Sequence, residues 1–66
     1  VRQLNRIKAV LTEKGRSNLW LANKLNRNAA TVSRWCTNTS QPSVEMLYEI
    51  AQWLDVDIRD LLNKTK

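Results

Sequence analysis

The chain contains no histidine and no phenylalanine, and only one cysteine, one glycine and one proline among its 66 residues. Without histidine, and with a single thiol, the sequence lacks the ligand set of a zinc site. The lone Cys36 cannot form a disulfide within the chain, which excludes a disulfide-stapled secreted scaffold. We therefore expect a cytoplasmic protein that holds neither a metal nor a cofactor.

Other chemical signatures are also scarce. The sequence has no glycine-rich phosphate loop, and its carboxylates fall at expected helix caps and exposed turns. An enzyme is therefore the least expected class of protein. No apolar run approaches the ~20 residues of a membrane span, and no signal-peptide pattern opens the chain.

The charge is positive and unevenly distributed. Eleven cations and six acids give a net charge of +5. Residues 1–44 hold eight of the cations and one acid, whereas residues 45–66 hold three cations and five acids. A surface that served solubility alone would spread its charges more evenly. This asymmetry favours a polyanionic partner on one side of the domain.

The pattern along the chain predicts helices throughout. Apolar side chains recur at helical spacing, and no strictly alternating run indicates a half-buried strand. A chain of this length supports one small domain, which we place at residues 1–66. The prediction is an all-α, compact five-helix bundle with helices at about 2–14, 17–25, 28–37, 43–54 and 57–63.

The expected helix ends have identifiable residues. Gly15 is suited to stop the first helix, and Asn26 and Asn38 follow helices where a left-handed backbone is expected. Capping side chains are predicted at Ser17, Asn28, Ser43 and Asp57. The predicted inner faces are Leu4, Ile7, Val10 and Leu11 in the first helix and Val44, Leu47, Ile50, Ala51 and Leu54 in the fourth.

Two expected helices joined by residues 26–28 carry the clearest functional signal. Their apolar residues fall at spacings that pack one helix across the other, namely Leu21, Leu25, Val32 and Trp35. The small Ala22 allows the helix axes to approach closely, and Asn26 lies where the chain must reverse. This is the spacing of a helix-turn-helix unit, whose second helix can enter a DNA major groove.

The second helix of this unit has two different faces. Burial of Val32 and Trp35 turns small, hydroxylated and cationic residues outward, namely Ala30, Thr31, Ser33, Arg34 and Thr37. Trp35 is therefore expected in the core rather than as a platform for base stacking. Cys36 is expected to be a small packed residue rather than a redox-active thiol.

The run SNLWLANKLNRNAATVSRWCTNTSQPS resembles the lambda-repressor-like, Xre-type helix-turn-helix regulators of bacteria and phages. The shared features are a capping serine, a Leu-Ala pair, the turn, a Ser-Arg-Trp run and a downstream Pro-Ser. The continuation LYEIAQWLDVDIRDLL is similar to the last two helices of that family, so the likeness covers about residues 4–62. It implies a five-helix bundle and sequence-specific binding of duplex DNA, usually as a dimer.

This likeness suggests DNA contacts on both helices of the unit. Asn18 and Asn28 are expected to hydrogen-bond phosphates, with capping alone as the alternative for Asn28. Ala29 and Ala30 stand where relatives often carry long polar side chains, and they can offer methyl contacts to thymine. The candidates for contacts with base edges are Thr31, Ser33 and Arg34. Contacts with the DNA backbone are expected from Thr37, Asn38, Thr39 and Ser40. Diffuse attraction to phosphates is expected from Arg27, Arg2, Arg6 and Lys24.

Four alternatives remain open at this stage. Arg34 can pair with guanine or clamp a phosphate, and Arg27 can be a solvated charge. Some of Trp53, Ile58 and Leu62 form a self-complementary patch that pairs two copies on a palindromic operator, or each of them completes the core. Met46 and Tyr48 are also expected at or beyond the inner stripe. The second candidate function is a protein-interaction module on the same fold, such as an antitoxin whose main partner is a toxin.

Overall fold

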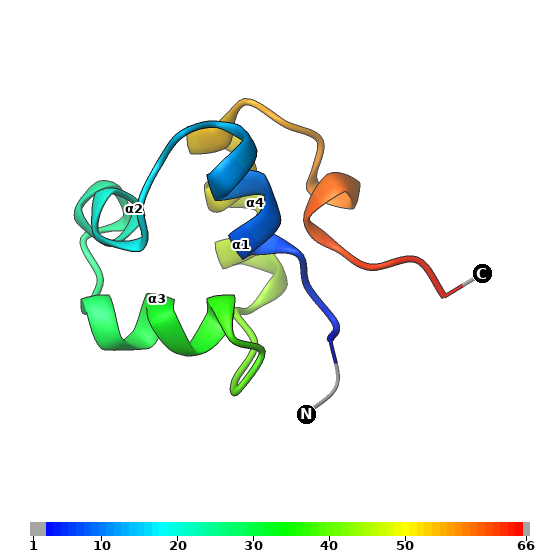
Figure 1. Cartoon of the computed structure of the whole chain (residues 1–66), viewed down its shortest axis with the longest axis horizontal. Coiled ribbons are helices and arrows are strands. Elements are labelled where there is room, and N and C mark those ends of the chain that lie inside the picture. Colours follow the sequence, from blue (N-terminus) through cyan, green and yellow to red (C-terminus); the bar gives the residue numbers. More distant parts are fainter. Residues whose placement is uncertain (1–2, 66) are drawn as a thin grey trace.

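The computed structural model describes residues 3–65, which form a small helical bundle (Figure 1). Its regular elements are the α-helices α1 (Ile7–Glu13), α2 (Asn18–Leu25), α3 (Ala29–Cys36) and α4 (Val44–Leu54) and the 3₁₀ helix η1 (Ile58–Leu61). The described residues contain no strand, and one isolated antiparallel bridge joins Asn5 and Leu62. The all-α class is therefore confirmed, with four α-helices in place of the five predicted.

The predicted caps and turns lie where the sequence suggests. Each capping side chain accepts a hydrogen bond from a backbone N–H at the start of its helix, in the pairs Ser17–Trp20, Asn28–Ala30, Ser43–Met46 and Asp57–Arg59. The left-handed backbone is also confirmed, with φ of 54° at Asn26, 61° at Asn38 and 67° at Gly15. These local signals set four helix starts and three reversals of the chain.

The first helix begins at Ile7 and not at residue 2, so the prediction of a helix over 2–14 was too long. The Asn5 side chain accepts a hydrogen bond from the backbone N–H of Ile7. The backbone before it pairs with the C-terminal segment instead, because Arg6 N–H donates to Leu61 and Asn63 N–H donates to Leu4. Leu4 is consequently 46% exposed rather than buried. Residues 1–2 lie outside the described part.

The predicted fifth helix over 57–63 is a four-residue 3₁₀ turn, Ile58–Leu61. It ends at Leu62, which has extended backbone angles and forms the bridge to Asn5. Val44 also differs from the prediction, because it is 70% exposed. Val44 is the first residue of α4, and the buried stripe of that helix starts with Met46 and Leu47.

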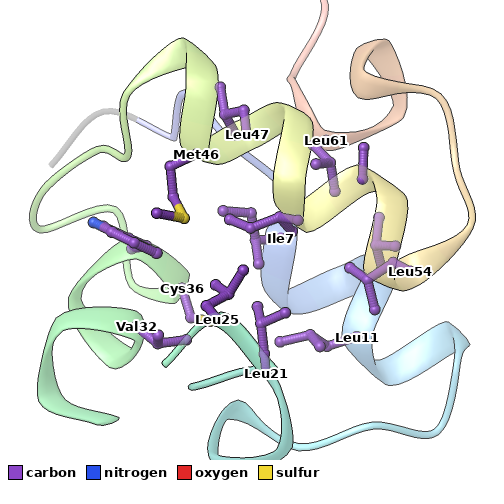
Figure 2. Packing of buried hydrophobic residues seen from close by; sticks show 14 of the residues in the cluster. Ile7, Leu11, Leu21, Leu25, Val32, Cys36, Met46, Leu47, Leu54 and Leu61 are labelled. Atoms are coloured by element: carbon purple, nitrogen blue, oxygen red, sulfur yellow. The ribbon is translucent and has the colours of Figure 1, made fainter. Parts of the chain in front are cut away.

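The core draws on all five elements (Figure 2). Its largest fully buried side chains include Ile7, Leu11, Leu21, Ile50 and Leu61, which come from α1, α2, α4 and η1. Met46, which we expected at or beyond the inner stripe of α4, points into this core and is buried. The elements on either side of the helix-turn-helix unit therefore serve as a scaffold that holds α2 and α3 in place.

Candidate nucleic-acid interface

Helix α3 lies along one edge of the molecule, at the bottom of Figure 1. Val32 is fully buried and Trp35 is only 7% exposed, so the inner side of α3 is anchored in the core. Trp35 is thus a core residue, as predicted. With these two residues buried, the rotation of the helix about its own axis is set, and the opposite side faces away from the bundle.

The outward side, which we call the α3 face, consists of Ala29, Ala30, Thr31, Ser33, Arg34 and Thr37. All are exposed except Thr31, which is half-buried. Arg34 forms no ion pair with any residue in the 3–65 range. The Thr37 hydroxyl donates within the helix, to the carbonyls of Ser33 and Arg34, and it also hydrogen-bonds with Thr39. The α3 face therefore presents methyl groups, hydroxyls and one free guanidinium.

The turn between α2 and α3 is compact. Asn26 adopts the left-handed conformation that ends α2, and Arg27 N–H donates back to the carbonyl of Ala22 at 3.0 Å. Ala22 is buried at the junction, as its small size predicted. Asn28 then starts α3 by accepting from Ala30 N–H at 2.7 Å. Only three residues separate the two helices, so the position of α3 depends directly on that of α2.

Asn18 and Asn28 both use their carbonyl oxygen inside the protein. Oδ1 of Asn28 accepts the capping hydrogen bond, and Oδ1 of Asn18 accepts from the Cys36 thiol at 3.3 Å. Within the described residues, neither Nδ2 group donates to a protein acceptor. The side-chain NH₂ group of each asparagine is therefore available to donate a hydrogen bond. A phosphate oxygen is an acceptor and requires such a donor.

Cys36 is the packed residue that the sequence suggested. It is buried, and this burial raises the pKa of its thiol above the ordinary value, although Lys8 opposes the shift. The thiol therefore stays protonated at neutral pH and acts as a donor to Asn18. This is the opposite of the low-pKa, accessible environment of a reactive cysteine.

Asn38 is placed differently from our expectation of a DNA contact. Its side chain is 5% exposed, and Oδ1 accepts from the backbone N–H groups of Leu4 and Asn5, each at 2.9 Å, and from Gln41. Its Nδ2 donates to Gln3 and to the carbonyl of Asn5. The Asn38 amide is thus saturated inside the protein, and we no longer assign it a contact with DNA.

Asn5 is a site residue that our sequence analysis missed. It is 3% exposed, and its Nδ2 donates to the carbonyl of Trp35 at 2.9 Å and to Gln41 at 2.7 Å. Asn5 and Asn38 together tie the segment before α1 to the C-terminal end of α3. A local signal existed, since an asparagine two residues before a helix often accepts from the helix's first N–H, but its partner on α3 is 30 residues away.

The four cations suggested for diffuse phosphate attraction have different surroundings. Arg27 is exposed in the turn beside α3. Arg6 is half-buried. Its guanidinium donates to the carbonyl of Asp60 at 3.0 Å and forms an ion pair with the Glu13 carboxylate at 3.4 Å. The Lys24 ammonium lies 5.2 Å from the centre of the Trp53 ring. Arg2 lies outside the described part, so Arg27 is the candidate best placed to contact DNA.

The three residues suggested for dimerisation do not line a common hollow. Trp53 is 45% exposed and lies beside Trp20 and Arg16. Ile58 is partly buried against the core, in a hollow with Tyr48. Leu62 is exposed beside Asn63 near the chain ends. Dimerisation through some of these residues therefore stays a prediction.

Two other kinds of site are absent from residues 3–65. No group of three or more potential metal ligands (His, Cys, Asp or Glu) lies close enough together to hold an ion. In the same part of the chain, every helix is too short or too polar to cross a lipid bilayer.

Comparison with known proteins agrees with this geometry. The helix-turn-helix family model matches residues 7–61, which includes all five elements. One similar solved structure is that of a candidate DNA-binding protein from Bacteroides fragilis, with 55% identity and a TM-score of 0.90 over 91% of this chain and 97% of the other. No curated protein matches the chain. The chain therefore belongs to the lambda-repressor-like, Xre-type helix-turn-helix family of DNA-binding domains.

Proposed function

We propose that this protein binds double-stranded DNA sequence-specifically, as a small cytoplasmic transcriptional regulator, with α3 in the major groove. The observation that carries the proposal is the α3 face itself. Val32 and Trp35 anchor the helix, and its outer side carries small and hydroxylated residues with one free arginine. Small side chains let a helix approach base edges closely, and the cation supplies attraction to the duplex.

The individual roles follow from the groups that each residue offers. Arg34 pairs with guanine in the major groove, while Thr31 and Ser33 hydrogen-bond neighbouring base edges. Ala29 and Ala30 contact thymine methyl groups. The Nδ2 groups of Asn18 and Asn28 donate to phosphates at the two helix starts, which sets the register of α3 on the duplex. Arg27 and Thr37 lie at opposite ends of α3 and contact the DNA backbone.

Dimerisation is part of this proposal. Two copies of α3 about 34 Å apart match successive turns of one face of a duplex and hence a palindromic operator. The exposed Leu62 and the partly buried Ile58 are the apolar candidates that we retain for the contact, because the Trp53 ring already lies against the Lys24 ammonium. Sedimentation of the protein with a palindromic duplex tests this directly, and a single bound copy would refute it.

The decisive experiment starts with selection of bound duplexes from a random pool, which yields the operator. Arg34→Ala should then weaken binding to this operator by about 1–3 kcal/mol and relax the preference at one base pair, because a bidentate contact is lost. Lys64→Ala is the matched control, since it removes one exposed positive charge from the C-terminal segment, which runs away from α3 in Figure 1.

Two results would contradict the proposal in different ways. If Arg34→Ala weakened operator and random duplexes equally, Arg34 would be a phosphate contact rather than a base contact. If selection returned no common sequence, sequence-specific binding itself would be refuted. The second candidate function, a module whose main partner is a protein such as a toxin, would then take precedence.

A further inference from the structure

A second surface of this molecule combines tryptophan with positive charge. We define the tryptophan face as Trp20, Trp53, Lys14, Arg16 and Lys24. The Arg16 guanidinium lies 4.6 Å from the centre of the Trp20 ring, and the Lys24 ammonium lies 6.0 Å from Trp20 and 5.2 Å from Trp53. The cations thus lie over aromatic rings, at distances typical of cation–π contacts.

The tryptophan face encloses a hollow of about 220 Å³. Lys14, Arg16, Trp20 and Trp53 line it, together with Leu54 and Asp55. The volume is below the about 300–1,000 Å³ of pockets that enclose whole small-molecule ligands. It suits a single inserted side chain. Trp20 packs against the core and the hollow joins the α1–α2 connection to the end of α4, so the surface is held by three elements.

The position of this face separates it from the proposed DNA contact. In Figure 1 the α1–α2 connection and the C-terminal end of α4 lie at the top, and α3 lies at the bottom. The molecule measures 33 × 24 × 22 Å. Charges on its opposite sides are therefore separated by more than the Debye length of about 8 Å at physiological ionic strength. Arg16 and Lys24 hold their charges over tryptophan rings, so this face offers contacts that a duplex seated on α3 does not use.

We infer that the tryptophan face binds a protein segment in which acidic residues flank an aromatic or large aliphatic side chain. Two cations, Lys14 and Arg16, line the hollow with one acid, Asp55, and the Lys24 ammonium lies over the Trp53 ring beside it. The face therefore carries excess positive charge, and its electrostatic complement is an acidic segment. The apolar side chain of the partner enters between Trp20 and Trp53, and its neighbouring carboxylates contact Arg16 and Lys24. Tryptophan and arginine side chains that a partner covers are among the residues that most often contribute most of the binding free energy of a protein interface.

This surface is independent of the DNA contact and gives a regulator a second point of attachment. It assigns a function to Lys14, Arg16 and Lys24, which the α3 face does not use. A partner bound here leaves Arg34 and the rest of the α3 face free, so the protein can hold DNA and a protein at the same time.

Selection from a random peptide library on the full chain tests the inference. The expected outcome is a set of peptides with Asp or Glu beside an aromatic or large aliphatic residue. Binding of a selected peptide, measured by fluorescence anisotropy, should fall about tenfold or more in Trp53→Ala and in Lys24→Glu. Lys64→Glu is the matched control for the charge reversal and should leave the affinity within about twofold.

The tryptophan side chains provide a direct spectroscopic measure of where the peptide lies. On addition of the peptide, the indole N–H signals of Trp20 and Trp53 should shift, and that of the buried Trp35 should not. Operator affinity should be the same in wild type and Trp53→Ala. Failure of this inference with operator binding intact is therefore distinguishable from failure of the proposed function.

Four outcomes would overturn the inference. The first is selection of no acidic consensus, and the second is peptide binding that persists in both Trp53→Ala and Lys24→Glu. The third is self-association that Lys24→Glu abolishes, which would assign the face to a second copy of the chain. The fourth is a single-stranded oligonucleotide that shifts the Trp20 and Trp53 signals while the selected peptides do not.

Discussion

The α3 face and the tryptophan face are both positively charged, yet their chemistry differs. The α3 face presents alanine methyl groups and hydroxyls around Arg34, with no bulky side chain to hold a partner away. The tryptophan face presents two large rings with Arg16 and Lys24 over them. The first surface is suited to the close approach of a regular groove, and the second to the capture of a protruding side chain.

This difference teaches that net charge alone does not assign a partner. The basic half of the sequence divides between two sides of the folded molecule. On the α3 side, the cations have few neighbours and can reach phosphates. On the tryptophan face, the aromatic rings attract the cations, so their charge is partly compensated and lies beside the hollow.

The largest expected effect compares two tryptophans, one from each side of this division. Trp35→Ala should lower the free energy of unfolding by about 3–5 kcal/mol, because it leaves a cavity under α3. Trp53→Ala should cost much less, because that side chain is 45% exposed. Denaturant unfolding monitored by circular dichroism measures both. If Trp35→Ala does not fold, Trp35→Phe should fold with a smaller loss; equal losses for Trp35→Ala and Trp53→Ala would refute the anchoring of α3.

A middle-sized effect is expected at Asn38, which ties the α3 end to the chain ends. Asn38→Gly should cost about 1–3 kcal/mol, because the buried N–H groups of Leu4 and Asn5 lose their acceptor. Asn38→Ala should cost about 1 kcal/mol more than Asn38→Gly, because a φ of +61° strains alanine but not glycine. Thermal or chemical unfolding of both variants checks the order, and a more stable alanine variant would contradict it.

The smallest effect separates the cations of the two faces through the salt dependence of DNA binding. Arg27→Ala should reduce the slope of log affinity against log salt by about 1, because one phosphate contact is lost. Lys24→Ala should leave this slope unchanged, since its ammonium lies against Trp53. Titrations of the selected operator at several salt concentrations provide the measurement. A matching decrease in Lys24→Ala would place that lysine in the DNA contact.

Much of the fold could be predicted because its signals are local. Ser17, Asn28 and Ser43 cap helices through hydrogen bonds that span two or three residues, so the sequence contains both the capping residue and its position. The outward direction of Ser33 and Arg34 follows likewise from the helical repeat and the burial of Val32 and Trp35. The same reasoning explains why Cys36 was expected to be packed.

The chain ends could not be predicted in this way. Leu4 has the right spacing from Ile7 and Leu11 for one helical stripe, so a helix from residue 2 was a reasonable but wrong prediction. The backbone of residues 4–6 instead pairs with residues 61–63, more than 50 positions away. Without that pairing in view, a periodic pattern extends a helix beyond its true start.

The site shows the same division between local and distant causes. Asn38 was correctly expected to adopt a left-handed backbone, which depends on its own side chain and the helix before it. Its burial was missed, because the hydrogen-bond partners that enclose it are Leu4 and Asn5, more than 30 residues earlier. Lys24 was likewise assigned to phosphates because the nearness of Trp53 is not visible in the sequence.

By itself, the amino-acid sequence determined where α2, α3 and α4 start, where the chain reverses and which side of α3 is buried. These features depend on residues within a few positions of each other, so a helical repeat and a capping side chain suffice. Only the tertiary structure decided how the chain ends pair, which groups hydrogen-bond with Asn38 and which cations lie over tryptophan rings. Those outcomes depend on hydrogen bonds and aromatic contacts between distant segments, which become neighbours only when the core assembles.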